Sequence, residues 1–179
     1  MSHYLDCKDL NLKALTITGF CKLLTLGRIP EPSGILAKLL LQFWNLDSTP
    51  EISQMLHAFF RYYTTLKSQH WEIFVDAYKK VLAVYIGYLT DAERHNDGNV
   101  QISETNFTKM FKMGMYLTSP NYLETHSKFT RDRNYNIDIY NYIMYSWGEN
   151  LARELPSETA TEAYIRIIAY AEFTEATPS

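Results

Sequence analysis

The chain has 179 residues, of which 46% are hydrophobic and 15% aromatic. This is ample material for a packed core, so composition excludes a wholly disordered protein. The formal charge is −3, from 17 basic and 20 acidic residues, which gives no whole-chain signature of a nucleic-acid-binding protein. Seven glycines and six prolines are few, and this favours long helices over short strands joined by turns.

Two cysteines, Cys7 and Cys21, are too few for a disulfide framework. Cys21 lies in an apolar helical pattern, where a small buried thiol is expected. The chain opens without a charged-then-apolar leader, and no apolar run approaches the length of a membrane span. We therefore expect a soluble intracellular protein with no membrane partner.

The first predicted helix covers residues 10–26, because apolar residues recur there at helical spacing. They are Leu12, Leu15, Phe20, Leu23 and Leu24. Gly27 is a typical helix stop, and prolines at positions 30 and 32 prevent continuation. Ser33 is then expected to cap a second helix, whose apolar residues are Ile35, Leu36, Leu39, Leu40, Phe43 and Trp44.

A third helix is predicted to begin at Pro50, because Thr49 is a typical N-cap and Glu51 meets the positive end of the helix. One of its faces is apolar, through Ile52, Met55, Leu56, Phe59, Phe60 and Tyr63. Ser68 is expected to cap a fourth helix with the same periodicity. Its apolar positions are Trp71, Phe74, Val75, Tyr78, Leu82, Tyr85, Ile86 and Leu89.

The polar segment 92–103 is predicted to be an inserted loop. A fifth helix is expected from Ser103 and Glu104 to the stop at Ser119–Pro120. Residues 121–136 are ambiguous and leave room for one short helix. A sixth helix is predicted over 137–155 and a seventh over 160–171, with a frayed tail at 174–179.

No segment alternates with period two, so the predicted fold class is all-α, with about seven helices in a single domain, 1–179. Paired helices starting near residues 10 and 50 are about 40 residues apart, which is typical of HEAT-like helical-hairpin repeats. In such an α-solenoid, neighbouring hairpins stack and bury each other's apolar faces. The segment 39–63 would then form the seam between two repeats. A closed helical bundle fits the periodicities equally well, and the repeat spacing gives the α-solenoid a modest advantage.

Two consecutive segments, 18–29 and 35–45, resemble the C-terminal HEAT-repeat region of the condensin subunit CAP-G family. In that family a glycine, apolar, cysteine, lysine, leucine, leucine helix precedes a leucine-rich helix that ends in an aromatic residue and asparagine. An acidic turn and a helix with paired phenylalanines follow, matched here by Asp47, Glu51, Leu56, Phe59, Phe60 and Tyr62. The segment 115–120 also resembles a later family motif. Leu46, Ser53 and Arg61 depart from the pattern.

The resemblance covers roughly residues 5–173, and the chain is expected to be a fragment of a longer protein or a short diverged paralogue. It implies a non-catalytic scaffold that is located in the nucleus and on chromosomes. A cytoplasmic location is a second possibility. Such a scaffold binds the kleisin and other condensin subunits in mitotic chromosome condensation during cell division, beside SMC subunits that hydrolyse ATP. The alternative is a stand-alone helical adaptor outside condensin that binds a protein partner.

The sequence predicts no catalytic, cofactor-binding or metal-binding residue, because the histidines lack the close partners of a zinc site and no phosphate loop or nucleophile elbow occurs. Short basic runs are most often solvated surface, but one contains a tyrosine. Its residues are candidate DNA contacts: Lys128, Arg131, Arg133 and Tyr135. An unpartnered apolar end of the helical array would bind a partner or a second copy. The candidate face is Leu12, Leu15 and Phe20.

Overall fold

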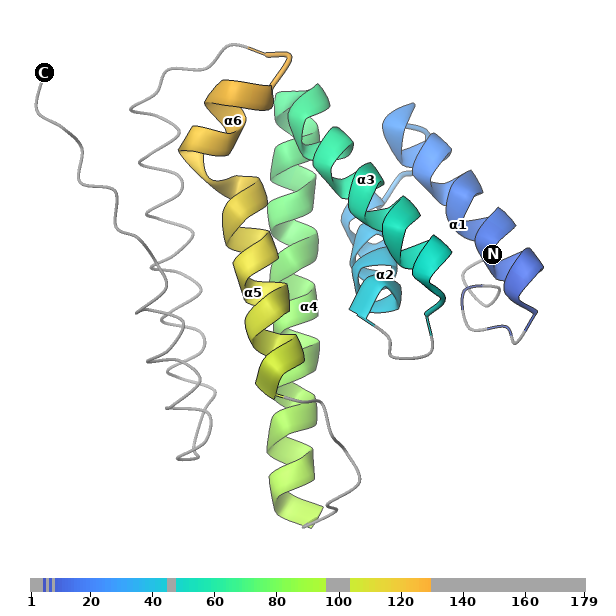
Figure 1. Cartoon of the computed structure of the whole chain (residues 1–179), viewed down its shortest axis with the longest axis vertical. Coiled ribbons are helices and arrows are strands. Elements are labelled where there is room, and N and C mark those ends of the chain that lie inside the picture. Colours follow the sequence, from blue (N-terminus) through green and yellow to red (C-terminus); the bar gives the residue numbers. More distant parts are fainter. Residues whose placement is uncertain (1–4, 6, 8, 45–47, 96–103, 130–179) are drawn as a thin grey trace, which may run out of the picture. The chain divides into compact units, whose positions relative to one another are not determined.

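The structure is a computed structural model that describes residues 5, 7, 9–44, 48–95 and 104–129 (Figure 1). Over these residues it contains six α-helices and no strand, which confirms the all-α prediction. The helices are α1 (Leu10–Thr25), α2 (Pro32–Trp44), α3 (Pro50–Leu66), α4 (Ser68–His95), α5 (Glu104–Thr118) and α6 (Pro120–His126). The helices predicted over 137–155 and 160–171 lie outside the described residues.

Contacts group the chain into two compact units, Met1–Val81 and Leu82–Ser179. The first unit contains α1, α2, α3 and the first half of α4, and the second contains α5 and α6, which contact each other. The prediction of a single domain over 1–179 stays a prediction.

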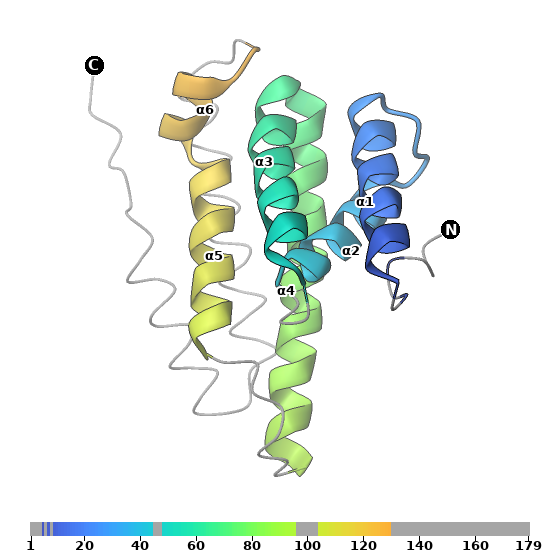
Figure 2. The same ribbon diagram turned by 45° about the vertical axis from the view of Figure 1, so that its right-hand side comes forward.

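In the first unit, α1 contacts both α2 and α3, and α2 contacts α3. Figure 2 shows α1 and α3 running in the same direction, with α2 crossing between them at an angle. A hydrogen bond of 3.4 Å from the Thr18 hydroxyl to the Met55 sulfur also joins α1 to α3. Contact between the first helices of two successive hairpins is what stacked helical repeats require. The arrangement is therefore consistent with the predicted HEAT-like pairs.

The bounds of α1 follow from its local sequence. The Asp9 carboxylate accepts hydrogen bonds from the N–H groups of Asn11 and Leu12, at 2.9 and 3.1 Å, and so caps the amino end. At the other end Gly27 has φ 65°, a left-handed conformation that glycine adopts without a Cβ clash. The stop predicted at Gly27 is confirmed.

The start of α2 differs from the prediction, because Ser33 lies inside the helix and does not cap it. Pro32 is the first helical residue, a position at which its missing N–H costs nothing. The Ser33 hydroxyl instead accepts a hydrogen bond from Lys80 Nζ at 2.6 Å. A hydrogen bond from Ser33 and the nearby Lys80 lower the pKa of the Asp76 carboxyl. Ser33 therefore links α2 to α4.

An aromatic core holds the α2–α3 hairpin. Phe60 is fully buried, and its ring meets that of Phe43 edge-on at a centroid distance of 5.9 Å. The Phe60 ring also lies 6.2 Å from that of Phe74 in α4. The buried aliphatic residues of the same two helices include Leu36, Leu39, Leu40, Ile52 and Leu56. The helix start predicted at Pro50 is confirmed, with the Thr49 hydroxyl accepting from the Ile52 N–H.

The boundary predicted between the fourth helix and the loop is wrong, because α4 continues to His95 and the loop cannot begin at residue 92. The segment 91–95 is polar, but alanine, glutamate and arginine are good helix formers. A helix end that is polar on all sides carries no apolar periodicity and so resembles a loop in the sequence. Residues 96–103 lie outside the described part.

Helices α5 and α6 meet at a tight corner in the second unit. Ser119 accepts from the Tyr122 N–H at 3.2 Å and Pro120 occupies the first turn, so α6 starts where α5 stops. The rings of Tyr116 and Tyr122 lie 4.8 Å apart across this corner. The short helix for which residues 121–136 left room is therefore present.

Candidate protein interface

Helix α1, together with its C-cap residue Leu26, carries two largely apolar faces that point in different directions. The inner face packs against the unit and consists of Lys13, Ile17, Phe20 and Leu24, each at most 8% exposed. The outer face, which we call the leucine face, consists of Leu12 (38% exposed), Leu15 (70%), Leu23 (39%) and Leu26 (68%). Helical geometry brings these four leucines to one side.

Of the three residues of the candidate partner face, Leu12 and Leu15 are exposed in the structure, whereas Phe20 is buried. Phe20 is only 7% exposed, because it stands three residues after Ile17 and four before Leu24 and so shares their inward direction. Whether Leu12 and Leu15 contact a partner stays a prediction.

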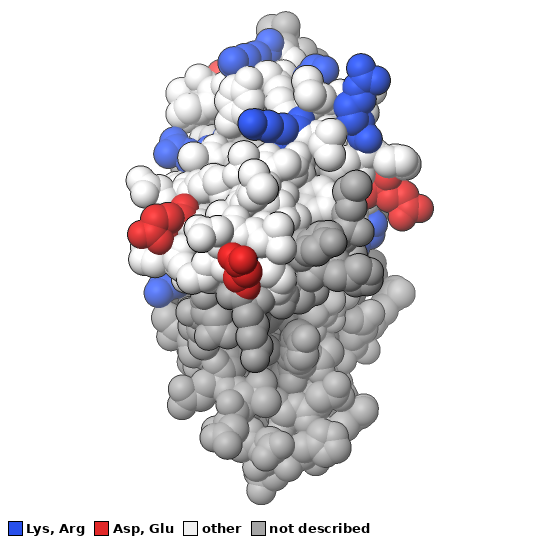
Figure 3. Space-filling model, turned by 90° about the vertical axis from the view of Figure 1, so that its right-hand side faces the viewer, with Lys and Arg blue, Asp and Glu red and all other residues white. Residues whose placement is uncertain are grey.

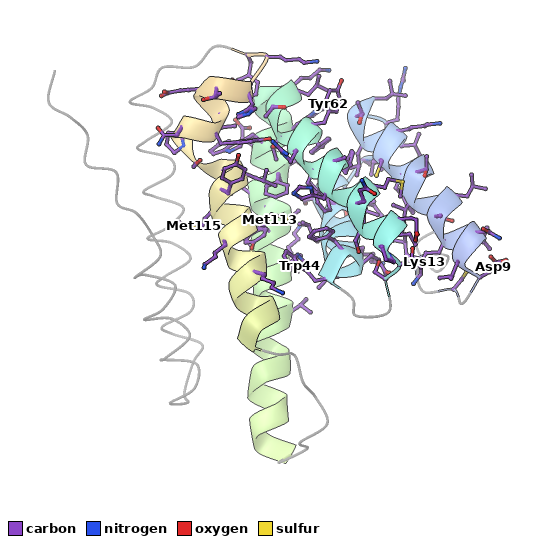
Figure 4. All side chains as sticks on the ribbon, in the orientation of Figure 1. Asp9, Lys13, Trp44, Tyr62, Met113 and Met115 are labelled. Atoms are coloured by element: carbon purple, nitrogen blue, oxygen red, sulfur yellow. The ribbon has the colours of Figure 1, made fainter. Side chains whose placement is uncertain are left out.

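Leu23 and Leu26 were not predicted to be exposed, although the sequence contains a signal for them. Residues 12, 15, 23 and 26 form one helical stripe and residues 13, 17, 20 and 24 form another. The stripe of residues 13, 17, 20 and 24 begins with a lysine. The all-leucine stripe therefore resembles a core face more closely in the sequence. In the structure the Lys13 side chain is only 8% exposed and so belongs to the inner side (Figure 4), as the long alkyl stem of a lysine allows.

Charged residues of opposite sign mark the two ends of α1. Asp9 stands at the amino end (Figure 4), and Lys22 and Arg28 stand towards the carboxyl end. All three side chains are exposed. Figure 3 looks at this side of the molecule and shows a largely uncharged centre, with most of the visible lysines and arginines gathered towards the end where α1 finishes. The leucine face therefore lies between one acidic residue and two basic ones, with the exposed Glu31 three residues beyond Arg28.

Only one of the candidate DNA contacts falls within the described part of the chain. Lys128 follows α6 and is exposed. Arg131, Arg133 and Tyr135 lie outside the described residues, so the predicted DNA-contact cluster stays a prediction.

Reactive chemistry is sparse in the described residues. Over that part of the chain, no three histidine, cysteine or acidic side chains gather as metal ligands would. Burial raises the pKa of the Cys21 thiol to about 12, so at neutral pH it is an unreactive thiol. The His57 ring lies 6.3 Å from that of Phe43 in a stacked arrangement.

A buried pair, Tyr63 and His70, lies at the end of the α3–α4 hairpin. The two rings are stacked with centroids 4.3 Å apart, and His70 is 4% exposed. The Tyr63 hydroxyl and His70 Nδ1 are buried without a hydrogen-bond partner within the described structure. Burial raises the pKa of Tyr63 to about 12, and burial together with the Lys67 charge lowers the pKa of His70. Neither side chain reaches solvent, so we interpret the pair as part of the structural core.

Among the helices that the structure describes, none combines the length and apolarity needed to cross a bilayer.

Together these features define the class: an all-α protein built from helical hairpins, whose most distinctive described surface is apolar. Comparison with protein families identifies one family. The Cnd3 model, described as nuclear condensing complex subunits, C-terminal domain, matches residues 1–170. The chain therefore belongs to this family of condensin subunits, which confirms the resemblance seen in the sequence at the level of the family. No curated protein matches the chain, and no solved structure does.

Proposed function

We propose that the protein is a non-catalytic HEAT-repeat scaffold of condensin. It binds the kleisin and other condensin subunits in the nucleus, on chromosomes that are being compacted for mitosis. Its contribution is to hold partners in place, while ATP hydrolysis belongs to other subunits.

The family match over residues 1–170 carries this proposal. The fold supports it, because stacked helical hairpins offer long surfaces to extended partners. The chemistry supports it as well, since the exposed leucines of α1 suit protein contact better than catalysis.

The test is co-purification. The tagged whole chain is co-expressed with the condensin kleisin, and in parallel it is used as bait in extracts of dividing cells read by mass spectrometry. An unrelated helical-repeat protein with the same tag is the control bait. We expect the kleisin and further condensin subunits to be enriched with this chain alone.

Recovery of no condensin subunit in either experiment would refute the proposal. Reproducible recovery of a different protein would support the alternative, an adaptor that works outside condensin.

Direct DNA contact is a secondary part of the proposal. The net charge of −3 argues against strong binding, so any contact rests on a local basic cluster. The cluster comprises Lys128, Arg131, Arg133 and Tyr135.

Fluorescence anisotropy with a labelled duplex measures this contact at low and at higher salt. We expect weak binding that falls steeply as salt rises and is lost in the variant K128A/R131A/R133A. A matched variant that removes three exposed lysines of the first unit controls for net charge: K22A/K38A/K67A. Absence of binding at low salt would remove DNA from the proposal.

A further inference from the structure

The leucine face of α1 is symmetric about one residue, Gly19. Leu12 and Leu26 stand seven residues to either side of it, and Leu15 and Leu23 stand four to either side. Offsets of four and seven both return to the same side of an α-helix. A helix placed antiparallel on this face, crossing at Gly19, would therefore meet the same pattern from either direction.

Gly19 leaves the middle of the leucine face open. A Cβ built at this position would meet no other atom within 4 Å. Packing inside the unit therefore does not require a glycine here, although glycine within a helix costs about 0.5–1 kcal/mol relative to alanine. A missing side chain at the centre of an exposed apolar face lets a second backbone approach closely.

The charges at the two ends of α1 favour an antiparallel neighbour with the same charge pattern. Asp9 stands at the amino end, and Lys22 and Arg28 stand towards the carboxyl end. An antiparallel copy of α1 would place its basic end near Asp9 and its acidic end near Arg28. A parallel copy would bring like charges together.

From these three features we infer that α1 is a self-association surface, which pairs antiparallel with α1 of a second copy of this chain about a twofold axis at Gly19. In this pairing Leu12 faces the partner's Leu26, and Leu15 faces the partner's Leu23. The contact is isologous, as the symmetry of the leucine face requires. The inference goes beyond the proposed function and does not depend on it.

The apolar part of the contact is small. Four leucines on each copy expose well under the ~800 Å² per partner that a stable interface buries. The dimer is therefore weak and forms as concentration rises, or when a larger assembly holds two copies close together.

Sedimentation velocity on the whole purified chain, over a series of concentrations, tests the pairing. Leu15→Lys alone and Leu23→Glu alone each place a charge against a leucine, and each should raise the concentration at half-dimerisation about tenfold or more. The double variant L15K/L23E places the introduced ammonium of one copy against the introduced carboxylate of the other and should restore dimerisation. Leu10→Lys is the matched control, because Leu10 is 50% exposed on α1 but lies off the leucine face.

A cross-link tests the axis directly. In a chain with Cys7→Ser and Cys21→Ala, Gly19→Cys should give a disulfide-linked dimer on mild oxidation, since a disulfide forms only where the two Cα atoms come within about 7 Å. Gln54→Cys, at an exposed site on α3, should stay monomeric.

Three results would overturn the inference. They are a monomer at every concentration, a dimer that L15K and L23E leave unchanged, and a failure of the double variant to restore what the single changes remove. Because only the purified chain is measured, none of these results bears on whether condensin subunits bind it.

Discussion

Replacing Phe60 by alanine would test the core that holds the α2–α3 hairpin. Phe60 is fully buried, with ring centroids at 5.9 Å from Phe43 and 6.2 Å from Phe74. Truncation of a buried phenylalanine to alanine costs about 3–5 kcal/mol, which includes the cavity left behind. We therefore expect a loss of about 4 kcal/mol in the free energy of unfolding. At about 2–4 °C for each kcal/mol in a chain of this size, the Tm should fall by roughly 8–16 °C.

Urea unfolding followed by circular dichroism and tryptophan fluorescence measures this loss. Phe59→Ala is the matched control, because Phe59 is the neighbouring residue on α3 but is only half-buried. Its truncation should cost clearly less than that of Phe60, since Phe59 is partly exposed in the fold and leaves a smaller cavity. The packing described for the hairpin is wrong if F60A costs no more than F59A.

Three further predictions concern the first unit. Tyr63→Phe removes a buried hydroxyl that has no hydrogen-bond partner in the described structure, so the urea midpoint should stay unchanged or rise by the equivalent of about 1 kcal/mol; a clear fall would show that the hydroxyl is bound. His70 has a lowered pKa in the fold, so its contribution to stability is complete above the unfolded pKa of about 6.5 and is lost as pH falls below it. Urea midpoints measured between about pH 7 and pH 5 should therefore fall less for His70→Gln than for the native chain, and equal slopes would contradict this. Thr49→Ala should cost about 1 kcal/mol in the same assay whereas Thr49→Ser should cost little, because serine keeps the cap of α3; equal losses would argue against the cap.

The sequence by itself determined where most helices lie. Gly27 ends α1, Thr49 with Pro50 starts α3, and Ser119 with Pro120 separates α5 from α6. These signals are reliable because each depends on residues only a few positions apart, through a fixed φ or a hydrogen bond to a nearby N–H. The membership in the condensin family is likewise visible in the order of the core residues, without coordinates.

Only the tertiary structure decided which side of α1 turns inward. Two stripes satisfy the helical period, and the buried one begins with Lys13 while the exposed one is all leucine. The tertiary structure also gave Ser33 a contact with Lys80 in place of a cap. The choice between two periodic faces depends on the shape of the neighbouring helices, and those neighbours come from residues far away in the chain. Local periodicity carries no information about that shape, so the inner and outer faces of α1 can be distinguished only after the hairpins have packed.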